Sequence, residues 1–179
     1  LEEKAAMYDS GSDPADTVWG RLIREHMADT LQYAKQLLQT ARQLAGNSDA
    51  LREKYLNTIT ANLQRMEQAQ LDIQSKGWDA IGEALALCRP EALPRVYKCP
   101  DPAVKDRIQG LCKKAADAVG KLPDLLCFGA DQCRDDIAFT GRYAAELFAT
   151  VGLFTQKFDA KKKQRRMVDF NDLEHGALR

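Results

Sequence analysis

The 179-residue sequence lacks the usual signatures of catalytic and membrane proteins. It has no Gly-x-x-x-x-Gly-Lys-[Ser/Thr] loop to bind nucleotide phosphates, and Gly120-Lys121-Leu122 does not form one. It has only His26 and His175, so a Ser-His-Asp grouping cannot be argued. No apolar run approaches twenty residues, and no export signal is visible. We therefore expect a cytoplasmic protein that has no contact with membranes and no catalytic residues of its own.

The charge balance and the cysteine content bear on binding of nucleic acid and of metal. The 26 Lys and Arg residues equal the 26 Asp and Glu residues, so attraction to nucleic acid must come from local clusters. No Cys-x-x-Cys pair exists, and both histidines lie far in sequence from the cysteines, so the spacing of a zinc site is missing. We expect reduced thiols and no metal, with an adventitious disulfide or metal as the alternative. The five cysteines are Cys88, Cys99, Cys112, Cys127 and Cys133.

The first half of the chain predicts two long helices. Asp13-Pro14 is typical of a helix start, apolar residues then recur every three or four positions, and Gly46-Asn47 predicts the end. A second helix with the same periodicity is expected from Ser48 to Gly77. Because the connection is short, residues 13–76 are expected to form an antiparallel helical hairpin.

The second half predicts further helices and no sheet. Residues 77–101 combine a short apolar helix with a proline-rich linker. Asp101-Pro102 repeats the cap-and-proline start, and Asp131 can open a last long helix, so residues 102–166 are expected to form a further helical bundle. No stretch alternates apolar β-branched and polar residues over four or more positions. The predicted fold class is all-α.

Aromatic residues lie mostly at apolar stripe positions of the expected helices. They are Trp19, Tyr33, Tyr55, Trp78 and the Phe residues of the last helix. Packing in a core is the favoured interpretation, and base stacking is the alternative. The expected stripe of the last helix is Ile137, Tyr143 or Ala144, Leu147, Val151, Phe154 and Phe158, after which the face turns basic.

Residues 157–166 carry six cations against one Asp, namely Lys157, Lys161, Lys162, Lys163, Arg165 and Arg166. Such a run can neutralise phosphates, which makes these residues candidates for DNA binding. The alternative is a solvated helix end whose cations oppose the negative pole of the helix dipole. Downstream, Asp169, Asp172 and Glu174 could hold a metal, but the start of a helix favours the same residues, and we prefer that interpretation.

The end of the sequence carries its most specific motif. VDFNDLEHGAL, residues 168–178, resembles the VDF-x-DLEH-x-AL segment of AddA, the helicase-nuclease subunit of the bacterial AddAB complex. More loosely, it resembles the DF-x-DL stretch of UvrD-like and RecB-like superfamily 1 helicases. The order of features upstream, including Trp78 and Leu93-Pro94-Arg95, is similar as well. The residues that carry the motif are Val168, Asp169, Phe170, Asp172, Leu173, Glu174 and His175.

The resemblance implies a domain organisation and a function. Residues 1–12 would lead in from a motor domain, residues 13–166 would form a helical accessory arm that approaches the duplex ahead of the fork, and residues 167–179 would return to the motor. Residues 1–6 and 168–179 would then lie on one side of the fold, or be loosely ordered without the motor domain. The parent would be an ATP- and Mg²⁺-dependent DNA helicase and exonuclease of double-strand break repair and recombination, with an AddB-like partner subunit.

The family's nucleotide-binding, arginine-finger and nuclease motifs have no counterpart in this sequence. The chain itself is therefore expected to be non-catalytic and to bind no cofactor. A helical scaffold or subunit-interaction domain that touches no nucleic acid is the alternative.

Overall fold

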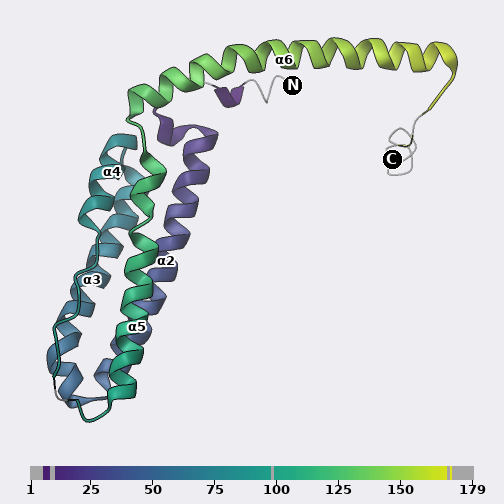
Figure 1. Cartoon of the computed structure of the whole chain (residues 1–179). Helices are drawn as coiled ribbons and strands as arrows, with labels where there is room; N and C mark the ends of the chain where they lie inside the picture. Colours follow the sequence, from purple (N-terminus) through teal and green to yellow (C-terminus); the bar gives the residue numbers. More distant parts are fainter. Residues whose placement is uncertain (1–5, 9–10, 98, 169, 171–179) are drawn as a thin grey trace. The chain divides into compact units, whose positions relative to one another are not determined.

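A computed structural model describes residues 6–8, 11–97, 99–168 and 170 of the chain. Its regular elements are all helical, and no strand occurs within these ranges, so the all-α prediction is confirmed (Figure 1). The chain divides into two compact units, one of residues 10–135 and one that joins residues 1–9 with residues 136–179. The α-helices are α2 (Val18–Gly46), α3 (Asp49–Ser75), α4 (Trp78–Leu87), α5 (Pro102–Val119) and α6 (Ala130–Arg165), and the 3-10 helices are η1 (Ala6–Tyr8), η2 (Pro14–Asp16) and η3 (Leu122–Leu126).

Helices α2 and α3 form the predicted antiparallel hairpin (Figure 1). Lys35 Nζ donates to Gln70 Oε1 at 3.0 Å, and the Arg24 guanidinium donates to the carbonyl oxygen of Lys76. The earlier residue of α2, Arg24, thus pairs with the later partner, Lys76, and the later residue, Lys35, pairs with the earlier partner, Gln70. Antiparallel helices require this order. Helix α5 packs along α2, so that three long helices surround one core.

The core of this unit is formed by the predicted stripes. Fully buried apolar side chains come from α2, α3, α4, α5 and η3, and burying each large one contributes about 1.5–3 kcal/mol to folding. The largest are Met27, Leu31, Leu38, Leu51, Tyr55, Ile59, Met66, Ile73, Ile81, Leu85, Ile108 and Leu122.

The start of α2 differs from the prediction. Asp13 and Pro14 open the short helix η2, whereas α2 begins after Thr17, whose backbone is extended at ψ 166°. Thr17 Oγ1 accepts a hydrogen bond from the Gly20 amide at 3.1 Å, as an N-cap residue does. The sequence pattern assigns the Asp-Pro pair to the wrong helix because both helices begin with a capping side chain within five residues of each other.

Asp13 instead connects two helix starts. Its Oδ1 accepts from the Ala15 amide at 2.8 Å and from the Trp78 amide at 3.1 Å, which caps η2 and α4 together. Asp79 Oδ1 accepts from the Ala130 amide at 2.8 Å and so caps α6. The prediction that Asp131 opens α6 is off by one position, and the Asp131 carboxylate pairs with Arg134.

The prediction of aromatic packing is right for some residues and wrong for others. Tyr55 and Trp78 are buried, and Trp78 Nε1 donates to the carbonyl oxygen of Phe128 at 2.8 Å. Trp19 and Tyr33 are 41% and 51% exposed, so for them the prediction is wrong. It is also wrong for most of the aromatic residues of α6, because no described element covers the side of the helix on which they lie.

Candidate functional site

Helix α6 presents a continuous apolar face to solvent. Successive positions are separated by four, four, four, three and four residues, which keeps their side chains on one side of an α-helix. We call this set the apolar stripe; its side chains are between 44% and 65% exposed. It consists of Phe139, Tyr143, Leu147, Val151, Phe154 and Phe158. Because large apolar side chains in a contiguous row are rarely left in water, the apolar stripe has the character of an interaction surface.

The aromatic rings of the apolar stripe contact one another and nearby cations. Phe139 and Tyr143 pack edge to face with centroids 5.1 Å apart, and Phe154 and Phe158 stack at 5.7 Å. The Arg142 guanidinium lies 6.0 Å from the Phe139 centroid, and Lys162 Nζ lies 5.0 Å from that of Phe158. Cation–π attraction therefore holds positive charge beside both ends of the apolar stripe.

Another side of α6 is covered within the same unit. The ring of Tyr8 lies 6.5 Å from that of Phe148, and a Cβ atom at Gly141 would lie 3.0 Å from the Tyr8 Cβ. Phe148 and Gly141 lie outside the apolar stripe on the helical wheel. The short helix η1 therefore packs on α6 without covering the apolar stripe.

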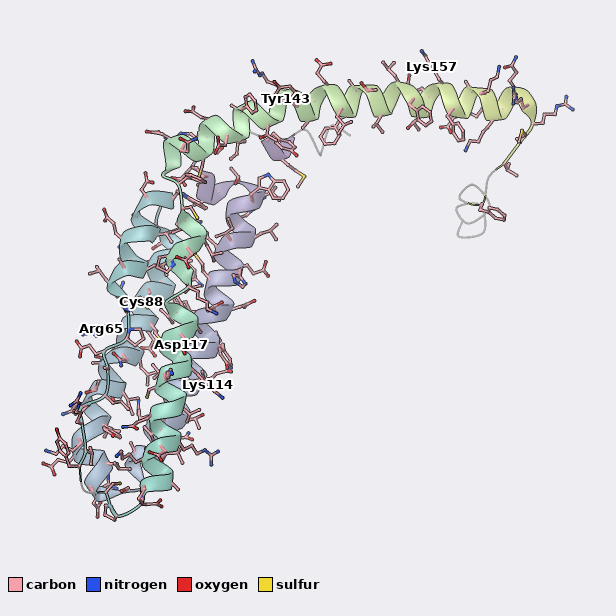
Figure 2. All side chains as sticks on the ribbon, viewed as in Figure 1. Arg65, Cys88, Lys114, Asp117, Tyr143 and Lys157 are labelled. Atoms are coloured by element: carbon pink, nitrogen blue, oxygen red, sulfur yellow. The ribbon has the colours of Figure 1, made fainter. Side chains whose placement is uncertain are left out.

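Three of the six predicted DNA-binding residues extend the apolar stripe toward the end of α6. Lys157, Lys161 and Arg165 are spaced by four residues, and Lys161 and Arg165 follow Phe154 and Phe158 by seven. Figure 2 labels Tyr143 and Lys157 along this helix. The change from aromatic to basic on one face was visible in the sequence, and it was the available signal that this stripe differs from a core stripe.

The remaining predicted cations do not continue this row, although Lys162 lies beside Phe158 at its edge. Lys163 is on another side of the helix, and Lys162 Nζ lies 3.5 Å from Asp159 Oδ1. Arg166 follows the helix in a left-handed conformation with φ 50°. Among the described residues, the five cations other than Lys162 form no ion pair. Of the six predicted cations, three therefore share one face of α6, Lys162 borders that face beside Phe158, and Lys163 and Arg166 lie apart from it.

A compact hydrogen-bonded turn ends α6. The Met167 amide donates to the Lys162 carbonyl at 3.0 Å, and the Arg166 amide donates to that of Lys163 at 3.2 Å. This is the Schellman arrangement, in which glycine usually occupies the position that Arg166 holds. The turn borders a hollow of about 190 Å³ lined by Phe158, Lys161, Lys162, Arg165, Met167 and Val168.

Replacing Arg166 with Gly is expected to strengthen this turn. A non-glycine residue in the left-handed region costs about 1–2 kcal/mol, and glycine removes that cost. Hydrogen exchange of the Arg166 and Met167 amides, followed by NMR, should slow by roughly five-fold or more, the factor equivalent to about 1 kcal/mol. Arg166→Ala serves as the control, because it removes the charge and keeps the strain. Equal hydrogen-exchange rates in the Gly and Ala variants would show that the left-handed backbone of Arg166 is not strained.

The family motif begins directly after this turn. Val168 is 67% exposed and Phe170 is 88% exposed. Asp169, Asp172, Leu173, Glu174 and His175 lie outside the described residues. The predictions that the carboxylates start a helix and that both chain ends lie on one side of the fold also fall outside them.

The cysteines are all free thiols in this structure; Cys88 is buried and Cys112 is partly buried. Burial raises the pKa of Cys88 and of Cys112 from 9.0 to about 11. No group of three or more His, Cys, Asp or Glu side chains in the described part of the chain is placed to hold a metal ion. None of the described helices combines the length and the apolar character needed to cross a membrane.

These thiols should differ in reactivity. Cys127 is exposed, so iodoacetamide at mildly alkaline pH should modify it at least about ten-fold faster than Cys88, which stays protonated and covered. Mass spectrometry of timed digests measures both rates, and a denatured sample, in which the rates should converge, is the control. Equal alkylation rates of Cys127 and Cys88 in the folded protein would contradict the burial of Cys88.

Because the folded pKa of Cys88 and Cys112 is raised, their stabilising contribution is complete below pH 9 and is lost as pH rises through about 11.

In comparison with known proteins, nearly the whole chain matches one segment of much larger proteins, the ATP-dependent helicase/nuclease subunits known as AddA. It is 26% identical over 183 residues, 99% of this chain, to the AddA protein of Ruminiclostridium cellulolyticum. It is 28% identical to AddA of Bacillus cereus, again over 99% of the chain, and 27% identical to that of Clostridium botulinum strain Alaska E43 over 92% of it.

The chain spans only 13–14% of the length of these relatives. No family model matches it, and no solved structure matches it. The chain is homologous to one segment of AddA, and the resemblance predicted from residues 168–178 is confirmed.

Proposed function

We propose that this chain is the helical arm of a helicase/nuclease of the ATP-dependent AddA type, and that it contacts duplex DNA without performing catalysis. Its parent would use ATP and Mg²⁺, act in double-strand break repair and recombination in the cytoplasm, and work with an AddB-like subunit. The homology over nearly the whole chain supports this proposal. No nucleotide-binding loop is present in the sequence, so ATP hydrolysis would fall to other parts of the parent protein.

The observation that carries DNA contact is the basic end of α6. Lys157, Lys161 and Arg165 share one face, are exposed and form no ion pair within the described ranges. Cations in this state can approach phosphate oxygens without first giving up a carboxylate partner. Phosphate contacts hold a duplex in place independently of its sequence, which suits a protein that must move along DNA.

A salt titration of duplex binding tests the proposal. The isolated chain should bind a short blunt duplex at about 50 mM salt and lose much of that affinity by about 200 mM, with affinity falling linearly on a double-logarithmic plot. Fluorescence anisotropy of a labelled duplex measures this directly. If the chain did not bind the duplex at about 50 mM salt, or if its binding did not weaken by about 200 mM, the arm alone would not contact DNA.

The apolar stripe favours a second candidate function, that of a packing surface for protein. Its six exposed apolar side chains would be covered by the rest of the helicase/nuclease polypeptide or by the partner subunit. The cations that follow on the same face would then meet an acidic edge of that protein. The two functions are compatible, because the stripe and the cations occupy successive parts of α6.

The exposed stripe has a measurable consequence for the isolated chain. Leu147→Glu with Phe154→Glu should markedly reduce binding of a hydrophobic dye and self-association measured by light scattering, because both substitutions interrupt the apolar stripe. Ala149→Glu with Gln156→Glu adds the same charge on another side of α6 and should change neither measurement. A wild-type chain that binds no dye and stays monomeric at every concentration tested would argue against this surface.

A further inference from the structure

The unit of residues 10–135 contains a groove that the sequence did not reveal. A hollow of about 400 Å³ lies between the linker that follows α4 and one side of α5. Its linker wall includes Arg89 and Leu93, and its α5 wall includes Gln109, Cys112 and Lys113. Figure 1 shows the linker running beside α3 back to the start of α5. All of these residues belong to the unit of residues 10–135, so the groove is internal to one compact body.

The groove exists because the linker is held against α3. The buried Asn62 side chain accepts from the Glu91 amide and donates to the Glu91 carbonyl, both at 2.9 Å. At the other end, Lys105 Nζ donates to the Val96 carbonyl at 3.2 Å. These contacts fix an extended segment that has no regular structure of its own. The hollow is therefore a built feature of the fold.

The charge at the groove is positive. Arg89 and Lys113 are exposed, stand on opposite walls and form no ion pair with any described residue. The Glu91 carboxylate, the acidic group of the lining, pairs with Arg65, which offsets its charge. Figure 2 labels Arg65 and Cys88 near the start of the linker.

The surrounding segment is basic within a neutral chain. Residues 89–121 hold eight Lys and Arg residues and four Asp and Glu residues, an excess of four positive charges. The chain as a whole has a net charge of zero. An anion near the linker and α5 would thus meet a local field that the overall composition conceals.

We propose that this groove is a second binding site for the phosphodiester backbone of DNA, separate from the end of α6. Arg89 and Lys113 would each donate to phosphate oxygens from opposite walls, and the sugar would lie against Leu93 and Ala116 between them. This inference rests on the proposed function, because it takes the bound polyanion to be DNA. It goes beyond that proposal by assigning contact to the unit of residues 10–135, where the sequence indicated none.

The test is duplex binding by Arg89→Gln with Lys113→Gln in the complete 179-residue chain. Losing two phosphate contacts should reduce the slope of log affinity against log salt by about two and weaken binding roughly ten-fold or more at low salt. Arg42→Gln with Lys54→Gln removes two exposed cations of α2 and α3 outside the groove and should change the slope much less. Circular dichroism melting verifies that each variant is folded.

A second variant tests the groove without removing a cation. Ala116→Glu places a carboxylate on the groove wall and should weaken duplex binding by a similar factor. Wild-type affinity and slope in both groove variants would overturn the inference while leaving the α6 site intact. Polyglutamate serves as a second probe. If the groove variants lost binding to polyglutamate but kept wild-type duplex binding, the occupant of the groove would be an acidic peptide, which would also overturn the inference. No duplex binding by the wild-type chain would remove the proposed function itself.

Discussion

Replacing Lys157, Lys161 and Arg165 together with Ala should reduce the affinity of the chain for duplex DNA by about ten- to a thousand-fold at low salt. Each lost phosphate contact lowers the slope of log affinity against log salt by about 0.9, so the triple variant should lose between two and three from that slope. The effect is expected to be large because the three side chains share one face of α6 and have no anionic partner among the described residues. Anisotropy titrations at several salt concentrations measure the affinity and the slope.

Two controls give this prediction its specificity. Lys163→Ala removes a neighbouring cation on another side of α6 and should lower the slope by much less than the roughly 0.9 expected for one lost phosphate contact. Arg21→Ala, Arg42→Ala and Lys54→Ala together remove the same charge as the triple variant from α2 and α3, and should have a much smaller effect than that variant. If all cation removals weakened binding equally, binding would depend on total charge and the assignment to α6 would be wrong.

Replacing Gly20 with Ala should destabilise the unit of residues 10–135 by about 3 kcal/mol, near the upper end of overpacking effects. A Cβ atom at this position would lie 1.9 Å from the Pro14 carbonyl oxygen and 2.6 Å from the Ala15 Cα. Both are backbone atoms of η2, which Asp13 holds through its bonds to Ala15 and Trp78, so they cannot move aside cheaply. The clash outweighs the roughly 1 kcal/mol by which Ala is the better helix former.

Gly110→Ala is the matched control for this prediction. Gly110 lies inside α5, and an added Cβ there would meet no atom within 4 Å. The substitution should therefore stabilise the protein by up to about 1 kcal/mol through helix propensity. Urea unfolding followed by circular dichroism gives both free energies of unfolding. A Gly20→Ala variant as stable as wild type would mean that η2 does not pack on α2 as described.

Local sequence signals placed most elements correctly. The Asp101-Pro102 pair starts α5, where Asp101 Oδ1 accepts from the Val104 amide at 3.1 Å. Such caps can be predicted because donor and acceptor lie within three residues of each other. The caps formed by Asp13 on Trp78 and by Asp79 on Ala130 span 65 and 51 residues, and no local pattern announces them.

The groove was invisible in the sequence for a related reason. In the sequence Asn62 is an ordinary polar residue of a predicted helix. In the structure it is buried and holds the Glu91 backbone through two hydrogen bonds. Arg89 and Lys113 lie 24 positions apart and become neighbours across a hollow only after the linker is fixed on α3. Long-range pairing of polar groups has no periodicity from which it could be read.

The sequence by itself determined the helical class, the hairpin, the basic run and the resemblance to AddA, because each depends on spacing or residue identity over short stretches. The tertiary structure decided which apolar stripes form a core. The stripes of α2, α3 and α5 bury one another, whereas the equally regular stripe of α6 remains exposed. Periodicity shows that a helix has an apolar face, but burial requires a second surface against that face, and only the folded arrangement supplies one.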